Sequence, residues 1–264
     1  MGYNPDMLAA LALMAFLDEF DDAADKVKFP SDEVLTQWAK KGDVQQKLVR
    51  TLTDPKGWAQ AFEAIQKKLG IGPGKVDIDV VFVEADGLRL AESKGSCGFG
   101  IIRFNMKRLV PYQKKMDDVD REMKAGKLAA WIIPPRRIDT VIAHELTHVM
   151  AGGGDALWVA EGLATYAAAD DSFLYEFNQR GGRVDSLDRP VSEDDAYSRG
   201  LSFFRWVEKE HGPEQVRKIA FRIATGVEKT DAVAADVLGK SWDQILLREK
   251  AWSAEYLSTF KTAR

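Results

Sequence analysis

Cysteine is nearly absent from this sequence: Cys97 is the only one in 264 residues. A single thiol cannot close a disulfide within the chain, so we expect a fold that is held together by packing. A catalytic cysteine would need an activating partner. The neighbours Gly95, Gly98 and Gly100 are instead typical of a turn. We therefore interpret Cys97 as a loop residue.

Basic clusters and long apolar runs are missing as well. The net charge is −4, and no nucleic-acid partner is expected because phosphate binding needs a clustered basic surface. The apolar run from Met7 to Leu17 is too short to cross a membrane and follows Asp6 rather than a basic segment, so it predicts neither a transmembrane segment nor a signal peptide. We expect a helix here that packs on the body of the protein, contacts a partner or has a regulatory role. The compartment stays open: secreted or periplasmic if an export signal has been removed, cytoplasmic otherwise.

The order of periodic segments predicts an α+β protein. Hydrophobic residues make up 45% of the chain and charged residues 30%, which suffices for one sizeable core or two lobes. Apolar residues alternate from Val76 to Phe82 as in a strand with one buried face, whereas spacings of three and four predict helices elsewhere. Helices are expected at residues 6–53, 55–70 and 111–124, and strands at residues 76–83, 88–91, 99–104 and 130–133.

The carboxyl third is expected to be helical. One helix should begin near Ser192, another should follow Gly212-Pro213, and Ser241 with Gln244 forms a capping-box signature for a last helix. The polar segment of residues 170–192 is interpreted as a loop that spans the cleft. Four aromatic residues are expected in the helical core: Phe204, Trp206, Phe221 and Trp242.

The pentapeptide His-Glu-Leu-Thr-His at residues 144–148 carries the clearest chemical signal. A helix turns once every 3.6 residues, so His144 and His148 project from one face and can bind one ion. On a helix this pattern is typical of zinc hydrolases, in which the middle residue, here Glu145, is the general base. Apolar residues at helical spacing and the glycines at 152–154 predict such a helix.

A second helix is expected after the glycines, where Asp155 can act as its cap and Glu161 can be brought back over the histidines. His-Glu-Leu-Thr-His-Val and Leu-Trp-Val-Ala-Glu-Gly-Leu-Ala-Thr-Tyr together resemble the gluzincin metallopeptidases, especially the aminopeptidase and peptidase-MA-like branch. The resemblance implies one catalytic Zn²⁺ bound by His144, His148 and Glu161, with Glu145 activating water. It also implies a zincin-like lobe, with a small twisted sheet behind the active-site helix.

Asp155 stays an alternative ligand. A metzincin would place a glycine three residues and a histidine or aspartate six residues beyond the second histidine. Those positions are Ala151 and Gly154, so the metzincin pattern fails, although Asp155 misses it by one residue. The gluzincin resemblance covers roughly residues 75–250, but its specific motifs occupy only residues 140–166.

Gluzincins commonly supply a tyrosine or histidine from a later helix to stabilise the oxyanion, and the resemblance favours Tyr197 for this catalytic role. His211 stands beside Gly-Pro at an expected helix end, where a structural role is favoured. Tyr166 is offset by about 140° from Glu161 on a helix, so we expect it in the core. Thr165, one turn beyond Glu161, is expected to hydrogen-bond near the metal.

The resemblance implies zinc-dependent hydrolysis of peptide bonds in a peptide or protein substrate. The Gly-x-Met-x-Asn motif of aminopeptidases is absent, so an endopeptidase is preferred to an aminopeptidase. The alternative is a zincin-like module that binds zinc without proteolytic turnover. By analogy with zincins, a strand near Phe99–Arg103 should pair with the substrate backbone, unless its hydrogen bonds are used within the sheet.

Three parts of the chain are predicted. Residues 1–70 form an N-terminal helical segment packed on the catalytic body, residues 71–170 a zincin catalytic lobe, and residues 171–264 a helical C-terminal lobe.

Overall fold

The structure is a computed structural model that describes residue 20 and residues 22–86, 89–126, 137–189, 191–224, 226 and 228–260. The apolar run of residues 7–17 and the strand expected at residues 130–133 lie outside the described residues and stay predictions. None of the described helices has the length and apolar character needed to span a bilayer.

The N-terminal part contains a strand, β1 (Val27–Lys28), which pairs in parallel with β2 (Asp77–Val83). The expectation of helix across residues 6–53 is therefore wrong at this point. A strand of two residues is too short to show an alternating pattern, so no periodicity indicates it. Burial of Val27 opposite Ile78 fixes this strand at the edge of the sheet.

Three helices follow β1: α2 (Asp32–Ala39), α3 (Asp43–Leu52) and α4 (Pro55–Leu69). The start predicted for α4 is confirmed. The Asp54 side chain accepts a hydrogen bond from the backbone N–H of Lys56, and Pro55 needs no N–H partner in the first turn.

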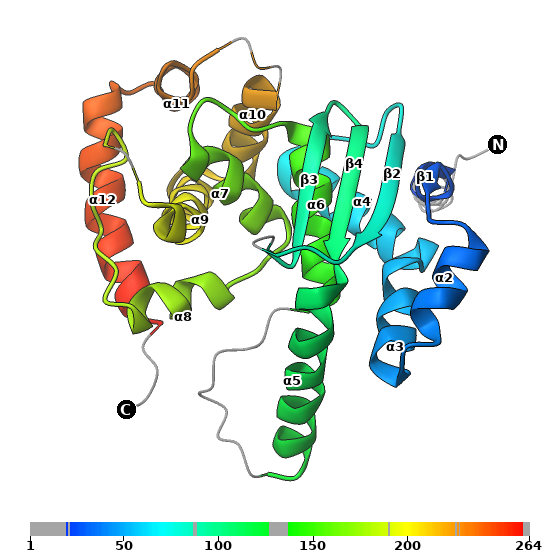
Figure 1. The fold of residues 1–264 in the computed structure, drawn as a ribbon. Coiled ribbons are helices and arrows are strands. Elements are labelled where there is room, and N and C mark those ends of the chain that lie inside the picture. The colour runs from blue at the N-terminus through cyan, green and yellow to red at the C-terminus, as the bar shows by residue number, and fades with distance from the viewer. Residues whose placement is uncertain are drawn as a thin grey trace, which may run out of the picture.

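Four strands form one mixed sheet in the order β1-β2-β4-β3 (Figure 1). β2 is parallel to β4 (Phe99–Asn105), and β3 (Ala91–Ser96) is antiparallel to β4. The alternation predicted for β2 is confirmed, since Ile78, Val80 and Phe82 are buried and their neighbours are not. The strand expected at residues 88–91 begins later, at Ala91, and Leu88 lies outside the described residues.

The interior position of β4 corrects the prediction that Phe99–Arg103 pairs with substrate. Residues of β4 pair with β2 on one side and with β3 on the other, so both edges of the strand are used within the sheet. Strand order is set by tertiary packing, so the local sequence of Phe99–Arg103 does not indicate whether the strand lies inside the sheet or at its edge. Within the described sheet, β3 is the edge strand on this side.

Helix α5 (Met106–Lys124) begins five residues earlier than the predicted start at Pro111. A proline favours the first turn of a helix, so the sequence suggested a start there. Met106 and Leu109 are buried, and their packing extends the helix ahead of the proline.

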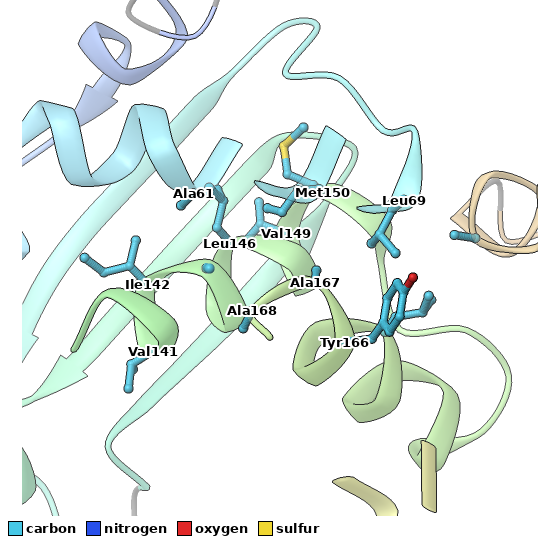
Figure 2. Close-up of a cluster of buried hydrophobic side chains, with 14 of the residues drawn as sticks. Ala61, Leu69, Val141, Ile142, Leu146, Val149, Met150, Tyr166, Ala167 and Ala168 are labelled. Carbon is cyan, nitrogen blue, oxygen red and sulfur yellow. The ribbon is translucent and has the colours of Figure 1, made fainter. Parts of the chain in front are cut away.

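The central helix is α6 (Ile138–Ala151), which contacts β3, α4 and α7 (Leu157–Ala167). Figure 2 shows Ile142, Leu146 and Val149 of α6 pointing into a cluster of buried side chains near Ala61 of α4. One face of α6 is thereby anchored in the core, and its other face is free to carry polar residues.

The C-terminal part contains α8 (Ser172–Gln179), α9 (Glu193–His211), α10 (Pro213–Ala224), α11 (Thr230–Leu238) and α12 (Trp242–Ser258). The predicted caps are confirmed, because Ser192 and Ser241 accept hydrogen bonds from the backbone N–H groups of Asp195 and Gln244.

Two expectations for the C-terminal part are wrong. The predicted loop of residues 170–192 contains α8, which forms because Phe173, Leu174 and Phe177 are buried on one side of a short helix. Phe221 is 60% exposed and so is not part of the core, whereas Phe204 and Trp206 are buried as predicted.

The mixed sheet and the many helices agree with an α+β fold. One hydrophobic cluster contains buried residues from Phe20 to Leu257, so it joins all three predicted parts of the chain. The boundaries at residues 70 and 170 and the zincin-like character of the middle part stay predictions.

Candidate metal centre

The polar face of α6 carries both histidines. His144 and His148 are four residues apart, and their ring centroids lie 4.8 Å from each other. The histidine side chains retain 11% and 19% of their exposure, so they reach the edge of the core but are not sealed inside it. The backbone N–H of Gly152 donates to the carbonyl of His148 and ends the helix as expected.

Glu161 comes from α7, which turns back across α6 as the helix–turn–helix prediction required. The start of α7 differs from the prediction, because its cap position is Ala156 and not Asp155. Asp155 instead accepts hydrogen bonds from the backbone N–H of Thr230, at 3.3 Å, and from its hydroxyl, at 2.5 Å. Asp155 therefore serves the start of α11 and is not the alternative metal ligand.

The three side chains converge on one point. His144 Nε2 lies 3.1 Å from Glu161 Oε2 and 3.2 Å from His148 Nε2, and the third side of the triangle, between His148 Nε2 and Glu161 Oε2, is 3.3 Å. Nitrogen and oxygen ligands at about 2.0–2.1 Å from a tetrahedral ion are separated by about 3.3–3.4 Å. The triangle thus has the size that a bound divalent cation requires. Among the described residues, these three form a group that can hold a metal ion.

The charge of this group also suits a cation. Burial favours the neutral form of Glu161, but hydrogen bonds with His144 and His148 outweigh burial and lower its pKa to about 2. Burial acts to lower the pKa of His148, yet the hydrogen bond and charge of Glu161 outweigh it and the pKa is raised. An ionised carboxylate beside two imidazoles is a ligand set for a divalent metal.

Thr165 acts on the backbone of Glu161 and not on its carboxylate. The hydroxyl of Thr165 donates to the carbonyl oxygen of Glu161 at 2.6 Å. The expected hydrogen bond near the metal is therefore corrected to a contact within α7, because a threonine hydroxyl readily reaches the carbonyl four residues back along a helix.

Glu145 shares a cleft with the triad. This cleft, which we call the metal hollow, has a volume of about 380 Å³ and is bordered by the triad, Glu145, Arg89 and Tyr197, together with residues of β3. Glu145 is 8% exposed, so its carboxylate lies at the wall of the hollow rather than in bulk water. Residues Ala91, Glu92, Ser93 and Gly95 place the edge strand β3 along the same hollow.

Tyr197 lies where the prediction placed it, beside the triad. Its ring stacks on His144 with a centroid separation of 5.7 Å and on Phe173 with a separation of 4.3 Å. This packing holds the tyrosine at the wall of the metal hollow. An oxyanion-stabilising role for its hydroxyl stays a prediction.

Two glycines allow α9 to carry Tyr197 so close to α7. A Cβ atom on Gly162 would lie 2.4 Å from the Cα of Gly200, and one on Gly200 would lie 2.0 Å from the carbonyl oxygen of Trp158. Side chains are excluded at this crossing, which comes directly after Glu161 in α7. The close helix contact therefore couples the position of Glu161 to that of Tyr197.

The other residues weighed from the sequence lie away from the triad. Tyr166 is fully buried, as expected for a core residue. His211 ends α9 and packs on Trp206; its pKa is lowered by burial and by the neighbouring Lys240. Cys97 is exposed in the turn between β3 and β4, as predicted.

Arg89 is the functional candidate that sequence reasoning missed. Its Nη1 atom lies 3.8 Å from Glu161 Oε1, and its guanidinium lies 5.0 Å from the ring centroid of Tyr197. Arg89 stands just before β3, far in sequence from the helices it contacts. A lone arginine before a strand matches no motif, so nothing in the local sequence could have identified it.

A comparison with protein-family models, curated proteins and solved structures finds no match for this chain. The interpretation of the centre consequently depends on the geometry of its own residues.

Proposed function

We propose that this chain is a zinc-dependent peptidase in which His144, His148 and Glu161 bind one Zn²⁺. The observation that supports this most directly is the triangle of two Nε2 atoms and one Oε2 atom, 3.1–3.3 Å apart, at the wall of a cleft. Two histidines and one carboxylate leave a zinc coordination position open, as hydrolytic sites need. When bound, zinc supplies a Lewis acid for a substrate carbonyl and lowers the pKa of a coordinated water to about 7.

Glu145 is proposed as the general base. It follows His144 in the chain and borders the metal hollow with it, so a water molecule held there is within reach of its carboxylate. Glu145 takes a proton from the attacking water and returns it to the leaving amine. Tyr197, which borders the same hollow, is proposed to donate a hydrogen bond from its hydroxyl to the developing oxyanion.

The substrate is proposed to be an extended peptide bound along β3. This strand lies at the edge of the described sheet and borders the metal hollow, so its outer hydrogen-bonding groups face the position where a peptide would lie. β3 thereby takes the role that the sequence suggested for Phe99–Arg103. A cleft that is open along a strand suits cleavage within a chain, which favours an endopeptidase.

The proposal is tested with zinc-loaded protein and a library of peptides of varied sequence. Cleavage products are identified by mass spectrometry, and zinc is measured for each variant. We expect Glu145→Gln to lower turnover by about 10²–10⁴-fold while it retains one zinc per chain, because only the proton transfer is lost. Asp139→Asn is the matched control, since Asp139 is an exposed acid in the first turn of the same helix.

The outcome that contradicts the proposal is bound zinc without cleavage of any library peptide by the unmodified chain. That result would support the alternative, a zinc-binding module without proteolytic turnover. Cleavage that survives Glu145→Gln would remove Glu145 from its proposed role.

A further inference from the structure

Arg89 joins the metal hollow to a second cleft. This cleft, which we call the side hollow, has a volume of about 370 Å³ and shares Arg89 and Tyr197 with the metal hollow. Tyr197 borders both hollows, and its ring stacks on Phe173 to form an apolar wall of the side hollow. A substrate that lies in the metal hollow can thus place a neighbouring group in the side hollow, against Arg89.

The side hollow is bordered by guanidinium and carboxylate groups. Arg89, Arg108 and Arg180 border it, against two carboxylates, Glu176 and Asp194. Asp194 is already engaged, because Arg180 Nη1 lies 3.5 Å from its carboxylate. Arg180 also pairs with Asp195 at 3.3 Å, so an incoming carboxylate is expected to meet Arg89 rather than Arg180.

Arg89 itself is paired in a way that a ligand can replace. One side of its guanidinium faces Glu161 Oε1 at 3.8 Å, and its Nη2 is paired with Glu193 at the start of α9. The Glu193 side chain is 69% exposed, and that of Arg89 is 45% exposed. Exposed ion pairs of this kind contribute little to stability, so a ligand carboxylate can take the place of Glu193 at little cost.

The chemistry of the guanidinium identifies the ligand class. Its planar donors match the two oxygens of a carboxylate, and Arg89 already holds one carboxylate in this structure. The aromatic wall gives the methylene groups of an acidic side chain, or the last residue of a peptide, an apolar surface to pack on.

We propose that Arg89 binds a carboxylate of the peptide substrate in the side hollow, next to the scissile bond. The inference rests on the proposed peptidase function, and it names a substrate class: peptides with an acidic side chain or a free carboxyl terminus beside the cleavage site. Arg89 thus sets specificity, while the triad and Glu145 carry the chemistry.

The test measures peptide binding to zinc-loaded Glu145→Gln protein, so that affinity is read without turnover. Three forms of one peptide are compared: a blocked peptide with a glutamate, the same blocked peptide with glutamine, and the glutamine peptide with a free carboxyl terminus. We expect one of the two carboxylate peptides to bind about tenfold or more tightly than the blocked glutamine peptide, since hydrogen bonds to charged groups are among the stronger ones. The peptide that gains affinity identifies the source of the carboxylate.

When Arg89→Ala is introduced into the Glu145→Gln protein, the preference for carboxylate peptides should disappear, while zinc content and melting temperature stay the same. Arg89→Lys should restore only part of it, because lysine keeps the charge but lacks the two-pronged donor geometry. Arg121→Ala is the matched control, since Arg121 is an exposed arginine that pairs with Asp118 on α5. Glu193→Gln provides an independent readout: it removes the competing carboxylate and should raise the ratio of acidic to neutral affinity severalfold.

Equal affinity for all three peptides, or a preference that survives Arg89→Ala, would overturn the inference. If the Arg89→Ala protein loses its zinc, the inference is tested by the ratio of acidic to neutral peptide affinity in the Glu193→Gln protein. A ratio unchanged by Glu193→Gln also counts against the inference. Failure of the proposed function has a different signature: the preference for carboxylate peptides is present, but the unmodified zinc-loaded chain cleaves none of them.

Discussion

Among the described residues, two polar clusters have partners that are arranged in opposite ways. In the first, Arg199 of α9 donates two hydrogen bonds of 2.9 Å to the carboxylate of Glu249 of α12, and both side chains are almost fully buried. Ser253 adds a hydrogen bond to Glu249, so the charges of this cluster satisfy each other. In the second cluster, the triad, the ring nitrogens and the carboxylate point at a shared position beside a cleft.

The difference is one between a structural cluster and a candidate metal centre. Removing one partner of a buried ion pair leaves an uncompensated charge, so the Arg199–Glu249 pair holds α9 against α12. Two Nε2 atoms 3.2 Å apart cannot both be satisfied as acceptors by each other. In zinc-free protein one ring must carry a proton on Nε2 to hydrogen-bond the other or Glu161, whereas the proposed metal ion would accept electron pairs from both rings.

The largest expected effect breaks the first cluster. We expect Glu249→Ala to lower the free energy of unfolding by about 3–5 kcal/mol, with or without zinc, because Arg199 is left buried without its partner. His148→Ala should cost zinc-free protein less, because the His148–Glu161 pair is only partly buried, and it should in addition remove the stability that depends on zinc. Urea denaturation with and without added zinc measures both. Equal losses for the two variants in zinc-free protein would contradict this distinction.

The next effect concerns Tyr197, which lies on the same helix as Arg199. Tyr197→Phe keeps the ring that stacks on His144 but removes the hydroxyl, so we expect kcat to fall by about 10²–10³-fold, the typical cost of one oxyanion donor. Zinc content should not change. Tyr166→Phe is the control, since Tyr166 is a buried tyrosine on α7 that does not border the metal hollow. An unchanged kcat for Tyr197→Phe would assign the oxyanion to another donor.

The third prediction concerns the pH dependence of zinc binding by the triad. The pKa of His148 is raised from its ordinary value of 6.5, so protons compete for this ligand from above that pH downward. Where His148 must lose a proton to bind metal, zinc affinity should fall by at least about tenfold per pH unit. Calorimetric titration with zinc between pH 5 and pH 8 measures this. An affinity independent of pH in this range would exclude histidine ligands.

The same groups predict a pH window for zinc-free protein. The pKa of Glu161 is lowered to about 2, so its stabilising contribution is present above the ordinary pKa near 4.5 and is lost as the pH falls through 2. The raised pKa of His148 gives a contribution that is present below 6.5 and is lost as the pH rises through the raised value. The triad should therefore stabilise zinc-free protein most between about pH 4.5 and pH 6.5, and His148→Ala should flatten this maximum in thermal unfolding.

The smallest effect tests the helix crossing that links the clusters. Gly200→Ala should cost about 1–3 kcal/mol of stability, because its Cβ would meet the carbonyl of Trp158 and one helix must shift. Gly57→Ala in α4 is the matched control, since nothing lies within 4 Å of a Cβ there and alanine is the better helix former. A Gly200→Ala protein as stable as the Gly57→Ala protein would show that the close crossing is not required.

Much of the candidate site could be predicted because its signals are local. The spacing of His144 and His148 on one helix, and the caps at Asp54, Ser192 and Ser241, depend on residues within one turn of each other. Periodicity likewise located β2, since one buried face produces alternation along the strand.

The parts that could not be predicted depend on contacts between distant segments. Asp155 looks like a cap for the helix that follows it, and only the fold brings Thr230 to its carboxylate. The interior position of β4 follows from strand order, and Arg89 reaches Glu161 because β3 and α7 both pack on α6. In each case the local pattern was compatible with several partners, and tertiary packing selected one.

The most direct test of the metal centre is X-ray absorption at the zinc edge of the purified, zinc-loaded chain. We predict one zinc per chain with nitrogen and oxygen neighbours at about 2.0–2.1 Å, two imidazoles among them, and no sulfur neighbour. His148→Ala should remove one imidazole from this spectrum, and Glu161→Ala should alter the oxygen contribution. A spectrum left unchanged by both substitutions, or zinc bound through other residues, would contradict the account.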